Sequence, residues 1–538
     1  MKRATLASMD GLMQDYPLLV RHVAERAENV FPDREIVSRT RDDVERTNYA
    51  QVVERARRIA SSLEKLGVRR GDRVATFGWN SMRHLELYLA VPSMGAVLHT
   101  LNIRLFEEDL HYIVGHAEDK VIFLDASLAE VMPKFEGVEH EVLMPDAPGE
   151  RAGALDYEQL VADGDPRFEF PDLDENSAAA MCFTSGTTGR PKGVVYSHRS
   201  TILHSMAAGH ADAMGLRQRD RVMPVVPMFH ANAWGIPYSA SLSGASLVFP
   251  GPRMTPQDIA ELIAAEQVTM SAGVPTIWQG ILQLEDPPDL SSLREIMCGG
   301  SAVPEALIRG YEERFGIPVL QGWGMTETSP LASTSRVPGE EDLSPDEQYK
   351  VRATQGRSLP LVDYRIDEEA GGELQVRGPW VARAYYNDET SPEKFTEDGW
   401  LRTGDVAELV HGSYIKLVDR TKDLVKSGGE WISSVELENE IMAHPDVLEA
   451  AVIAIPDERW SERPCACVVK RDGCTLDADA VLEHLKPRVA KWWLPDRIEF
   501  IDEVPKTSVG KFDKKVLRAR FAEVAEAGAP EQQRAAEA

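Results

Sequence analysis

The clearest chemical signal in this 538-residue chain is a segment dense in glycine and hydroxyl side chains, MCFTSGTTGRPKGVVYSH at residues 181–198. Its glycines allow backbone N–H groups to turn toward an anion, and Lys192 adds positive charge. A Walker A loop is excluded, because Pro191 precedes the lysine and no helix is expected there. The segment therefore predicts a phosphate-binding loop between two strands. Its hydroxyl donors are Thr184, Ser185, Thr187 and Thr188.

A second segment, residues 222–252, contains no Asp, Glu, Lys or Arg. A membrane-spanning helix is excluded, because several prolines and the polar His230 and Asn232 would interrupt or burden it. The segment is instead expected to line a pocket. Within it, His230 and Trp234 are four residues apart, which would make them neighbours on one face if the segment is helical.

The charge balance limits the kinds of partner. The chain has 59 Lys and Arg against 87 Asp and Glu, a formal net charge of −28, so nucleic acids and anionic membrane surfaces would be repelled. A small anionic ligand held by locally clustered positive charge remains compatible with this figure. With 43% hydrophobic and 27% charged residues, the chain is expected to fold around large cores.

Five cysteines are too few for a disulfide scaffold. Cys465, Cys467 and Cys474 lie close together, but without a local His or a Cys-x-x-Cys pair they are expected to belong to an apolar strand rather than a metal site. The first residues reach Asp10 before any apolar core develops, which excludes a signal peptide. A cytoplasmic protein is expected.

The elements that must position these residues follow an α/β pattern. An apolar helical period runs over residues 49–67 with Gly67 as a natural stop, a strand follows at 72–78, a helix at 81–94 and a buried strand at 120–125. Strands and helices keep alternating to about residue 320, which indicates largely parallel sheets.

The pattern changes in the last third of the chain. Short strands are expected at 372–378, 414–420 and 423–429, followed by a compact α+β region. The chain is therefore expected to have an α/β fold, with a large multi-subdomain N-terminal α/β domain (1–418) and a small C-terminal α+β domain (425–525). Residues 419–424 would form a hinge, and 526–538 a low-complexity, flexible tail.

Six ordered segments resemble the AMP-forming acyl-CoA synthetases, the adenylate-forming superfamily shared with firefly luciferase and peptide-synthetase adenylation domains. The overall sequence is most similar to bacterial medium- and long-chain fatty-acid–CoA ligases and methylmercaptopropionate–CoA ligases. The segments are TSGTTGRPKG at 184–193, CGGSAVP at 298–304, GWGMTETSP at 322–330, WLRTGDVA at 400–407, DRTKDLVKSGGEWIS at 419–433 and PKTSVGKF at 505–512.

The resemblance implies an ATP-dependent acid–thiol ligase that uses ATP, Mg²⁺ and CoA. Thr184 and Glu327 would hold Mg²⁺, Thr326 would contact the α-phosphate, and Asp405 with Arg420 would bind the ribose hydroxyls. Trp323 stands where the family usually has Tyr, and either ring can stack on a purine. The residues implied in ATP and AMP binding are Thr184, Ser185, Gly186, Thr187, Thr188, Gly189, Lys192, Gly300, Ser301, Gln321, Gly322, Trp323, Gly324, Thr326, Asp405, Arg420 and Lys511.

The resemblance also assigns the moving parts. Lys511 would be the catalytic lysine of adenylation, carried by a C-terminal domain that rotates about Lys422 to allow thiol attack. Catalytic roles are implied for Lys511, Thr184, Glu327 and His230. The implied CoA channel comprises Lys426, Gly428, Gly429, Glu430 and Trp431.

The acyl pocket is implied to include His230, Ala231 and Trp234, with Trp234 at the position of a gate in long-chain enzymes. Peptide-synthetase domains that activate amino acids carry Asp after this Phe, so His230 after Phe229 favours a plain carboxylic acid. A medium- or long-chain fatty acid is expected, and a short functionalised acid such as methylmercaptopropionate remains open.

The sequence disfavours two other functions. An enzyme that loads a carrier protein is disfavoured because no carrier domain follows and the SGGEWIS segment resembles the CoA type. A non-catalytic nucleotide-binding paralogue is disfavoured because Lys511, Glu327 and Asp405 are all present. A homodimer is expected from the resemblance alone.

Overall fold

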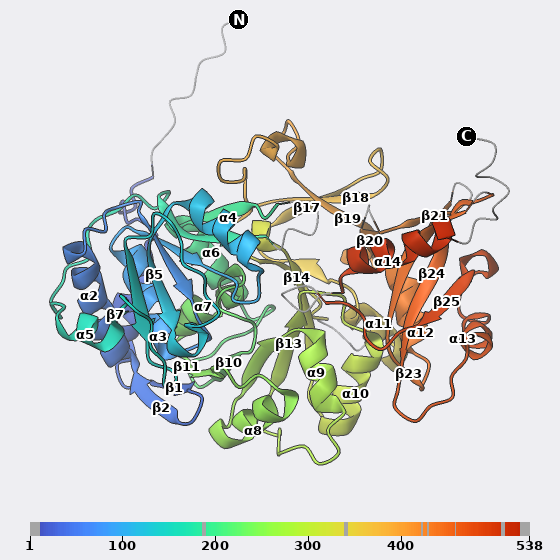
Figure 1. Cartoon of the computed structure of the whole chain (residues 1–538), viewed down its shortest axis with the longest axis horizontal. Coiled ribbons are helices and arrows are strands. Elements are labelled where there is room, and N and C mark those ends of the chain that lie inside the picture. Colours follow the sequence, from blue (N-terminus) through green and yellow to red (C-terminus); the bar gives the residue numbers. More distant parts are fainter. Residues whose placement is uncertain are drawn as a thin grey trace, which may run out of the picture.

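The computed structural model describes residues 11–184, 190–337, 343–420, 423–427, 430–457, 459–506 and 512–527. Within these ranges the strands form four sheets. Two large sheets lie in the N-terminal and central parts of the molecule, a small antiparallel sheet lies beside them, and the last sheet belongs to a separate C-terminal part (Figure 1).

The first large sheet has the strand order β7-β6-β5-β3-β4-β8-β9. All of its pairings are parallel except that of β8 with β9, which flank the expected phosphate loop. Its strands are β3 (Arg73–Phe77), β4 (Val97–Thr100), β5 (Asp119–Asp125), β6 (His140–Met144), β7 (Leu155–Asp156), β8 (Ala178–Phe183) and β9 (Gly193–Ser197).

The second large sheet has the order β16-β15-β14-β13-β12-β10-β11-β1-β2. It is parallel from β14 to β1 and ends in antiparallel strands on both sides. Its strands are β1 (Glu35–Arg39), β2 (Val44–Asn48), β10 (Arg221–Pro224), β11 (Ser246–Phe249), β12 (Met270–Gly273), β13 (Glu295–Gly299), β14 (Val319–Gly324), β15 (Leu331–Thr334) and β16 (Arg357–Ser358).

The remaining sheets follow along the chain. The antiparallel sheet comprises β17 (Asp363–Asp367), β18 (Glu373–Arg377), β19 (Leu401–Val410) and β20 (Tyr414–Arg420). The C-terminal sheet comprises β21 (Val425–Ser427), β22 (Glu430–Ile432), β23 (Val447–Asp457), β24 (Ser461–Lys470) and β25 (Arg497–Phe500). In this sheet β25 runs parallel to β24, whereas the other pairings are antiparallel.

Helices cover the faces of the sheets and bury several hydrophobic cores between them. The N-terminal helices are α1 (Val20–Val30), α2 (Tyr49–Lys65), α3 (Met82–Ser93), α4 (Glu107–Ala117), α5 (Tyr157–Ala162), α6 (His198–Ala208) and α7 (Ile236–Ser243). The later helices are α8 (Pro256–Glu266), α9 (Pro275–Leu282), α10 (Glu305–Phe315), α11 (Pro345–Arg352), α12 (Ser434–Met442), α13 (Ala478–Leu485) and α14 (Lys514–Ala527).

Local chemistry explains why the first helices begin and end where they do. The side chain of Asn48 accepts a hydrogen bond from the N–H of Gln51 at the start of α2, and Gly67 follows the helix with a φ of +90°. Ser81 caps α3 in the same way through the N–H of His84. These caps confirm the helices expected at 49–67 and 81–94. The first begins as expected and ends at residue 65, and the second runs from residue 82 to 93.

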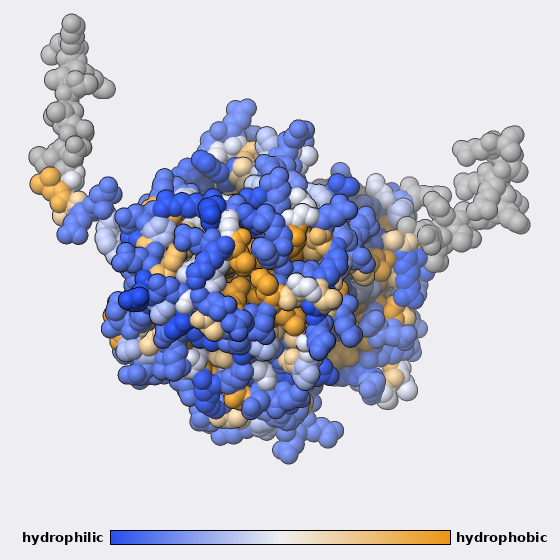
Figure 2. Space-filling view, turned by 60° about the vertical axis from the view of Figure 1, so that its left-hand side comes forward, coloured by the Kyte–Doolittle hydropathy of each residue, from blue (hydrophilic) through white to orange (hydrophobic). Residues whose placement is uncertain are grey.

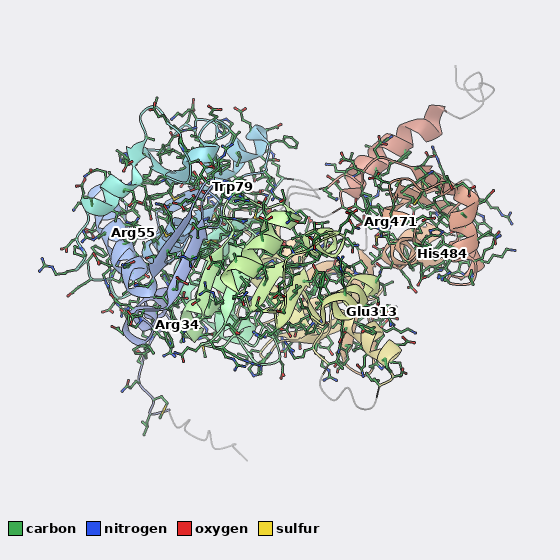
Figure 3. The ribbon with its side chains drawn as sticks, turned by 90° about the horizontal axis from the view of Figure 1, so that it is seen from below. Arg34, Arg55, Trp79, Glu313, Arg471 and His484 are labelled. Carbon is green, nitrogen blue, oxygen red and sulfur yellow. The ribbon has the colours of Figure 1, made fainter. Side chains whose placement is uncertain are left out.

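The C-terminal part has its own hydrophobic cores, between β23, β24 and the helices α12, α13 and α14. Seen from below, Arg471 and His484 lie in this part, at the opposite end of the molecule from Arg55 (Figure 3). Cys465 and Cys467 are buried on β24 and Cys474 follows in a turn. The strand interpretation of this cysteine cluster is therefore confirmed for the first two residues.

The face shown in Figure 2 is mostly hydrophilic, and its apolar residues gather mainly in the middle. None of the described helices combines the length and the apolar character needed to cross a bilayer. Within the described ranges, the uncharged residues 222–252 form β10, β11, α7 and a short turn, all largely buried.

Candidate active site

A cleft with an open volume of about 1120 Å³ lies at the carboxyl end of β14, next to the base of the expected phosphate loop. Ligands of open α/β sheets characteristically bind beyond the carboxyl ends of parallel strands. We call it the central cleft. Its described lining comprises Thr184, Arg190, Lys192, His230, Trp234, Gly300, Gly322, Trp323, Gly324, Met325, Thr326, Glu327, Pro330, Leu331, Tyr385, Lys394, Thr403 and Arg420.

The base of the phosphate loop is closed by two hydrogen bonds between its ends. The Thr184 N–H donates to the Lys192 carbonyl at 2.9 Å, and the Lys192 N–H donates to Oγ1 of Thr184 at 3.0 Å. The antiparallel pairing of β8 with β9 brings these ends together. The intervening residues Ser185, Gly186, Thr187, Thr188 and Gly189 lie outside the described residues.

The ammonium group of Lys192 contacts a loop nearly 200 positions later. Its Nζ lies 3.0 Å from Oδ2 of Asp388 and 2.5 Å from Oγ1 of Thr390, and it lies over the ring of Tyr385, 5.0 Å from the centroid. Burial alone would raise the pKa of Asp388, but hydrogen bonds from Thr390 and Lys192 hold it below its usual value. The anionic carboxylate of Asp388 is thus paired with the ammonium group that is expected to bind phosphate.

Glu327 is buried at the start of a short 3₁₀ turn (Thr326–Thr328) after β14. Its Oε1 accepts a hydrogen bond of 2.5 Å from the hydroxyl of Tyr385, and its carbonyl accepts one from the N–H of Ala382. Burial, together with the negative charge of Glu327, raises the pKa of Tyr385, so this phenol is a donor at neutral pH.

The donor set of the cleft fits Mg²⁺ arriving with ATP. Thr184 and Glu327 both line the cleft and offer a hydroxyl and a carboxylate oxygen. Mg²⁺ is typically bound by one or two carboxylates together with substrate phosphates and water. Among the described residues, no group of three or more His, Cys, Asp or Glu side chains could hold a metal by itself.

The opposite side of the cleft is formed by glycines and an indole. Gly300, Gly322, Trp323 and Gly324 all line it, as expected for an adenine slot. The indole N–H of Trp323 donates to Oδ2 of Asp405 at 3.2 Å.

Not every residue implied in ATP and AMP binding lines the cleft. Ser301 is exposed outside the described lining. Gln321 is buried, and its side-chain oxygen accepts the N–H of Val303 at 3.1 Å. Asp405 is also buried, behind Trp323 and Arg420.

The segment carrying His230 and Trp234 is not a right-handed helix. Ala231, Asn232, Ala233 and Trp234 all have φ between 42° and 57°, and together with Gly235 they form a left-handed turn. The neighbour relationship expected for His230 and Trp234 required a helix, and the left-handed turn does not meet that condition. Both side chains nevertheless line the central cleft.

Trp234 is 7% exposed, and its ring packs against a pair of glycines. A Cβ added at Gly299 would lie 3.3 Å from Cη2 of this indole, and one added at Gly300 would lie 3.8 Å from Cζ2. A side chain at Gly299 would therefore crowd the ring, whereas a Cβ at Gly300 would make an ordinary contact with it. Ala231 is buried beside it in the turn and does not line the cleft.

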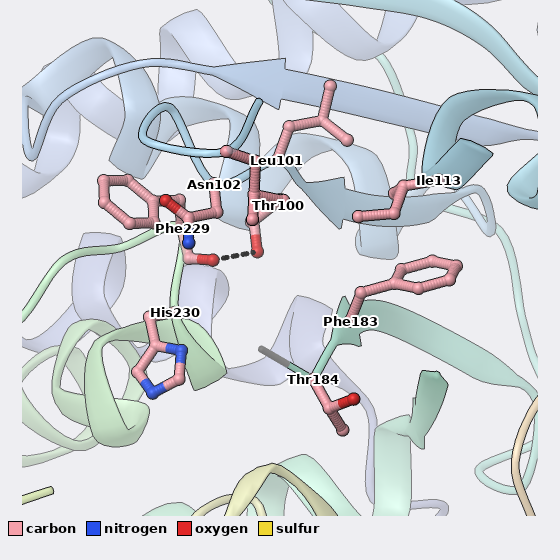
Figure 4. A pocket seen from close by; sticks show the side chains of 9 residues that line it. Thr100, Leu101, Asn102, Ile113, Phe183, Thr184, Phe229 and His230 are labelled. Atoms are coloured by element: carbon pink, nitrogen blue, oxygen red, sulfur yellow. Dashed lines mark hydrogen bonds between the residues drawn. The ribbon is translucent and has the colours of Figure 1, made fainter. Parts of the chain in front are cut away.

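A smaller side pocket with an open volume of about 340 Å³ adjoins the cleft (Figure 4). It shares His230 and Thr184 with the central cleft. One wall is tied by a 3.3 Å hydrogen bond from Oγ1 of Thr100 to the carbonyl of Phe229. Its apolar lining residues are Leu101, Leu105, Ile113, Phe183 and Phe229.

The C-terminal assignments are described only in part. Lys426 on β21 lies over the ring of Trp431 on β22, 5.4 Å from the centroid, and Trp431 is 48% exposed. Glu430 begins β22, but its side chain is not among the described features. Lys422, Gly428, Gly429 and Lys511 lie outside the described residues.

Sequence reasoning missed several residues that line the cleft. Tyr385 contacts both Glu327 and Lys192, while Arg190, Lys394 and Thr403 line the same space. Arg190 directly follows the glycine-rich loop, so its position was a usable signal. Nothing in the sequence around Tyr385 indicates a contact with Glu327.

Comparisons with known proteins agree with this geometry. The model of a family described as AMP-binding enzyme matches residues 24–386, and that of the AMP-binding enzyme C-terminal domain matches residues 436–511. A long-chain-fatty-acid–CoA ligase of Thermus thermophilus is 45% identical, covering 97% of this chain and 99% of the relative. A medium-chain-fatty-acid–CoA ligase of Ectopseudomonas oleovorans is 42% identical, covering 96% and 98%.

A 3-methylmercaptopropionyl-CoA ligase of Ruegeria pomeroyi is 43% identical, covering 96% of this chain and 99% of the relative. Among solved structures, the anthranilate CoA ligase AuaEII in complex with anthranoyl-AMP superposes with a TM-score of 0.85 at 26% identity. That comparison covers 96% of this chain and all of the other.

Proposed function

The chain belongs to the AMP-binding enzyme family and is an AMP-forming acyl-CoA synthetase, and on this premise we propose that its acid substrate is a medium- or long-chain fatty acid. Two of the relatives described above are named for such acids. The observation that carries the proposal is the position of Trp234, which lines the central cleft from within an uncharged segment.

An acid with a long tail needs an apolar space that begins where its carboxylate meets ATP. His230 lines both the cleft and the side pocket, whose other walls are mostly apolar, and Trp234 lines the cleft. Displacement of the indole from Gly299 and Gly300 would extend this space into the uncharged interior. Burial of each methylene group contributes about 0.8 kcal/mol, so such an interior favours longer tails.

A second candidate is a short functionalised acid of the methylmercaptopropionate type. With Trp234 only 7% exposed and packed against Gly299, a compact acid is the kind that would bind without displacement of the indole. The Ruegeria relative is named for this substrate. The two candidates differ in whether the indole must move.

The reaction has two half-reactions. An oxygen of the acid's carboxylate bonds to the α-phosphorus of ATP, the bond from that phosphorus to the bridging oxygen breaks, and pyrophosphate leaves. The thiol of CoA then bonds to the acyl carbon, AMP leaves, and the thiol proton passes to solvent. Mg²⁺ arrives with ATP and neutralises phosphate charge.

We assign the residues their roles in this scheme as proposals. Lys192 and Arg190 would hold the outer phosphates, Glu327 with Thr184 would hold Mg²⁺, and Lys511 would stabilise charge at the α-phosphate. The location of Thr184, Lys192 and Glu327 in one cleft supports these roles. The ribose role of Asp405 is supported by its contacts with Trp323 and Arg420.

The domain and assembly assignments are also proposals. Residues 1–418 would carry the ATP and acyl sites, 419–424 the hinge, and 425–525 the mobile lid with the CoA channel. A homodimer in the cytoplasm is proposed, and five free cysteines support a reducing compartment. Size-exclusion chromatography with light scattering tests the dimer, since a single species of 59.7 kDa would contradict it.

The substrate proposal is tested by pyrophosphate release with ATP and acids from C3 to C18, including 3-methylmercaptopropionate. The highest kcat/KM is expected for a medium- or long-chain acid, and Trp234→Ala is expected to change the chain-length profile. Trp460→Ala, an exposed tryptophan of the C-terminal part, is the matched control and should leave the profile unchanged. A maximum at the thioether acid would decide for the second candidate.

A further inference from the structure

Trp323 and Asp405 are joined by a hydrogen bond that crosses between two sheets. Trp323 lies on β14 of the large central sheet, and Asp405 lies on β19 of the small antiparallel sheet. The indole N–H of Trp323 is 3.2 Å from Oδ2 of Asp405, and both residues are at least nine-tenths buried. A hydrogen bond from a neutral donor to a buried carboxylate is among the stronger kinds in proteins.

The other oxygen of Asp405 has a different partner. Nε of Arg420 lies 3.0 Å from Oδ1, and the two residues face each other in the register of β19 and β20. The backbone N–H of Asp405 also donates to Oγ1 of Thr403 at 3.1 Å. Hydrogen bonds thereby hold Asp405 at both carboxylate oxygens and at its backbone N–H.

A carboxylate offers about four acceptor positions, two on each oxygen. Trp323 and Arg420 use one position on each oxygen of Asp405. Within the described part of the chain no other group donates to these oxygens, which leaves one position on each, and this is the pattern that two adjacent hydroxyl groups require. The direction in which these two free acceptor positions point depends on Trp323 and Arg420, which hold the carboxylate in place.

We propose that Trp323 is a positioning residue that acts through Asp405 and sets the preference of the enzyme for the two ribose hydroxyls of ATP. The inference rests on the proposed ribose role of Asp405. Trp323 lines the cleft while its indole N–H donates to the Asp405 carboxylate, so one residue would both contact the base and orient the group that binds the sugar.

The indole is suited to this task by its geometry. Its nitrogen is a donor only, so it cannot compete with the ribose hydroxyls as an acceptor. The nitrogen also lies in the five-membered ring close to the backbone, whereas the hydroxyl of a tyrosine lies at the far end of its ring. Tyrosine or phenylalanine at position 323 would keep an aromatic face but would not place a donor at the indole nitrogen.

The sharpest test replaces Trp323 by β-(benzothiophen-3-yl)alanine, an isosteric analogue with sulfur in place of the N–H. Adenylation and equilibrium binding are measured with ATP, 2′-deoxy-ATP and 3′-deoxy-ATP. The preference for ATP over the deoxy nucleotides, as a ratio of kcat/KM, is expected to fall about tenfold, the effect of one hydrogen bond to a charged group. In the variant, KM and Kd for ATP are expected to rise, whereas kcat at saturating ATP should be nearly unchanged.

Two variants keep the test decisive. Trp323→Phe retains an aromatic ring but lacks the indole N–H, so it should also lose the preference for ATP over the deoxy nucleotides. Trp380, a buried tryptophan whose N–H donates to the carbonyl of Leu331 at 3.1 Å, receives the same sulfur analogue as a matched control. This control loses a hydrogen bond of similar length and should keep the ribose preference.

The ribose role of Asp405 and the positioning role of Trp323 are tested separately. If Asp405→Asn leaves the preference for ATP over its deoxy analogues unchanged, the proposed ribose role itself is wrong. If Asp405→Asn abolishes the preference while the sulfur analogue at Trp323 retains it, only the positioning role of Trp323 is overturned. A loss of kcat without a change in KM for the sulfur analogue also overturns it.

Discussion

The hydroxyl of Tyr385 donates a hydrogen bond of 2.5 Å to Oε1 of Glu327, although the two residues are 58 positions apart in the chain. The same phenol ring lies beneath the ammonium group of Lys192. One tyrosine therefore contacts both the carboxylate proposed for Mg²⁺ and the cation proposed for phosphate. Residues 382–391 thus contact both the carboxylate of Glu327 and the ammonium group of Lys192.

Tyr385→Phe removes this donor and leaves the buried carboxylate of Glu327 without it. Such a hydrogen bond contributes about 1.5–3 kcal/mol, so a roughly tenfold lower rate of pyrophosphate release at saturating ATP is expected. The half-saturating Mg²⁺ concentration should rise in parallel. Tyr386→Phe is the matched control, because the hydroxyl of Tyr386 makes no hydrogen bond within the described part of the chain. Equal rates in both variants would contradict the role.

Asp388→Asn removes the carboxylate that lies 3.0 Å from Lys192. Because this carboxylate competes with phosphate for the same ammonium group, ATP and pyrophosphate should bind more tightly. The pair is partly exposed, so the gain is expected to be about threefold to fivefold, the range of a surface ion pair. Isothermal titration with pyrophosphate measures it, and Glu389→Gln, a neighbouring exposed carboxylate, is the control. Weaker binding would mean that Asp388 holds Lys192 in its working position.

Lys511→Ala should abolish adenylation while CoA transfer from supplied acyl adenylate continues. The reason is that the lysine is assigned to the α-phosphate in the first half-reaction only. The two half-reactions are measured separately, by pyrophosphate release and by thioester formation. Lys506→Ala is the control, since Lys506 pairs with Glu449 at 2.7 Å and has no assigned role. Equal loss of both half-reactions in Lys511→Ala would sink the assignment.

Three buried histidines predict how stability depends on pH. Burial lowers the pKa of His84 and His198 to about 4 and that of His204 to about 3, below the ordinary 6.5. Below pH 6.5 the unfolded chain therefore binds protons that the folded protein does not. The free energy of unfolding should fall as the pH drops from 6.5 toward 4, by up to about 1.4 kcal/mol per pH unit for each histidine.

Urea unfolding between pH 8 and pH 5 measures this slope. Above pH 6.5 these histidines contribute no pH dependence, and below it His198→Gln should reduce the slope by about one proton. The imidazole of His198 accepts the N–H of Val20, so the variant loses some stability at every pH. An unchanged slope would show that His198 is protonated in the folded protein.

Much of the fold could be predicted from the sequence because helix ends and strand–helix alternation are set by short segments of the chain. The helix Tyr49–Lys65 ends just before Gly67 and begins after the side-chain cap of Asn48, and both signals are visible in the sequence. The parallel sheets followed from alternating strands and helices. Motif spacing likewise located Thr184, Lys192 and Glu327, which the fold brings to one cleft.

The remainder depends on contacts that no local pattern records. Tyr385 and Tyr386 are adjacent and chemically identical, and only the fold directs the first toward Glu327. The hydrogen bond from Trp323 to Asp405 joins positions 82 apart. The left-handed residues Ala231–Trp234 include no glycine, so their conformation follows from tertiary packing rather than from intrinsic preference.

That left-handed turn has a mechanical consequence. A non-glycine residue in this conformation costs about 1–2 kcal/mol relative to the right-handed one, and four such residues are adjacent, the last of them Trp234 itself. If displacement of the indole lets one of them relax, the free energy released would offset part of the cost of moving the ring away from Gly299. We therefore expect backbone strain in residues 231–234 to assist a long acid in displacing the indole.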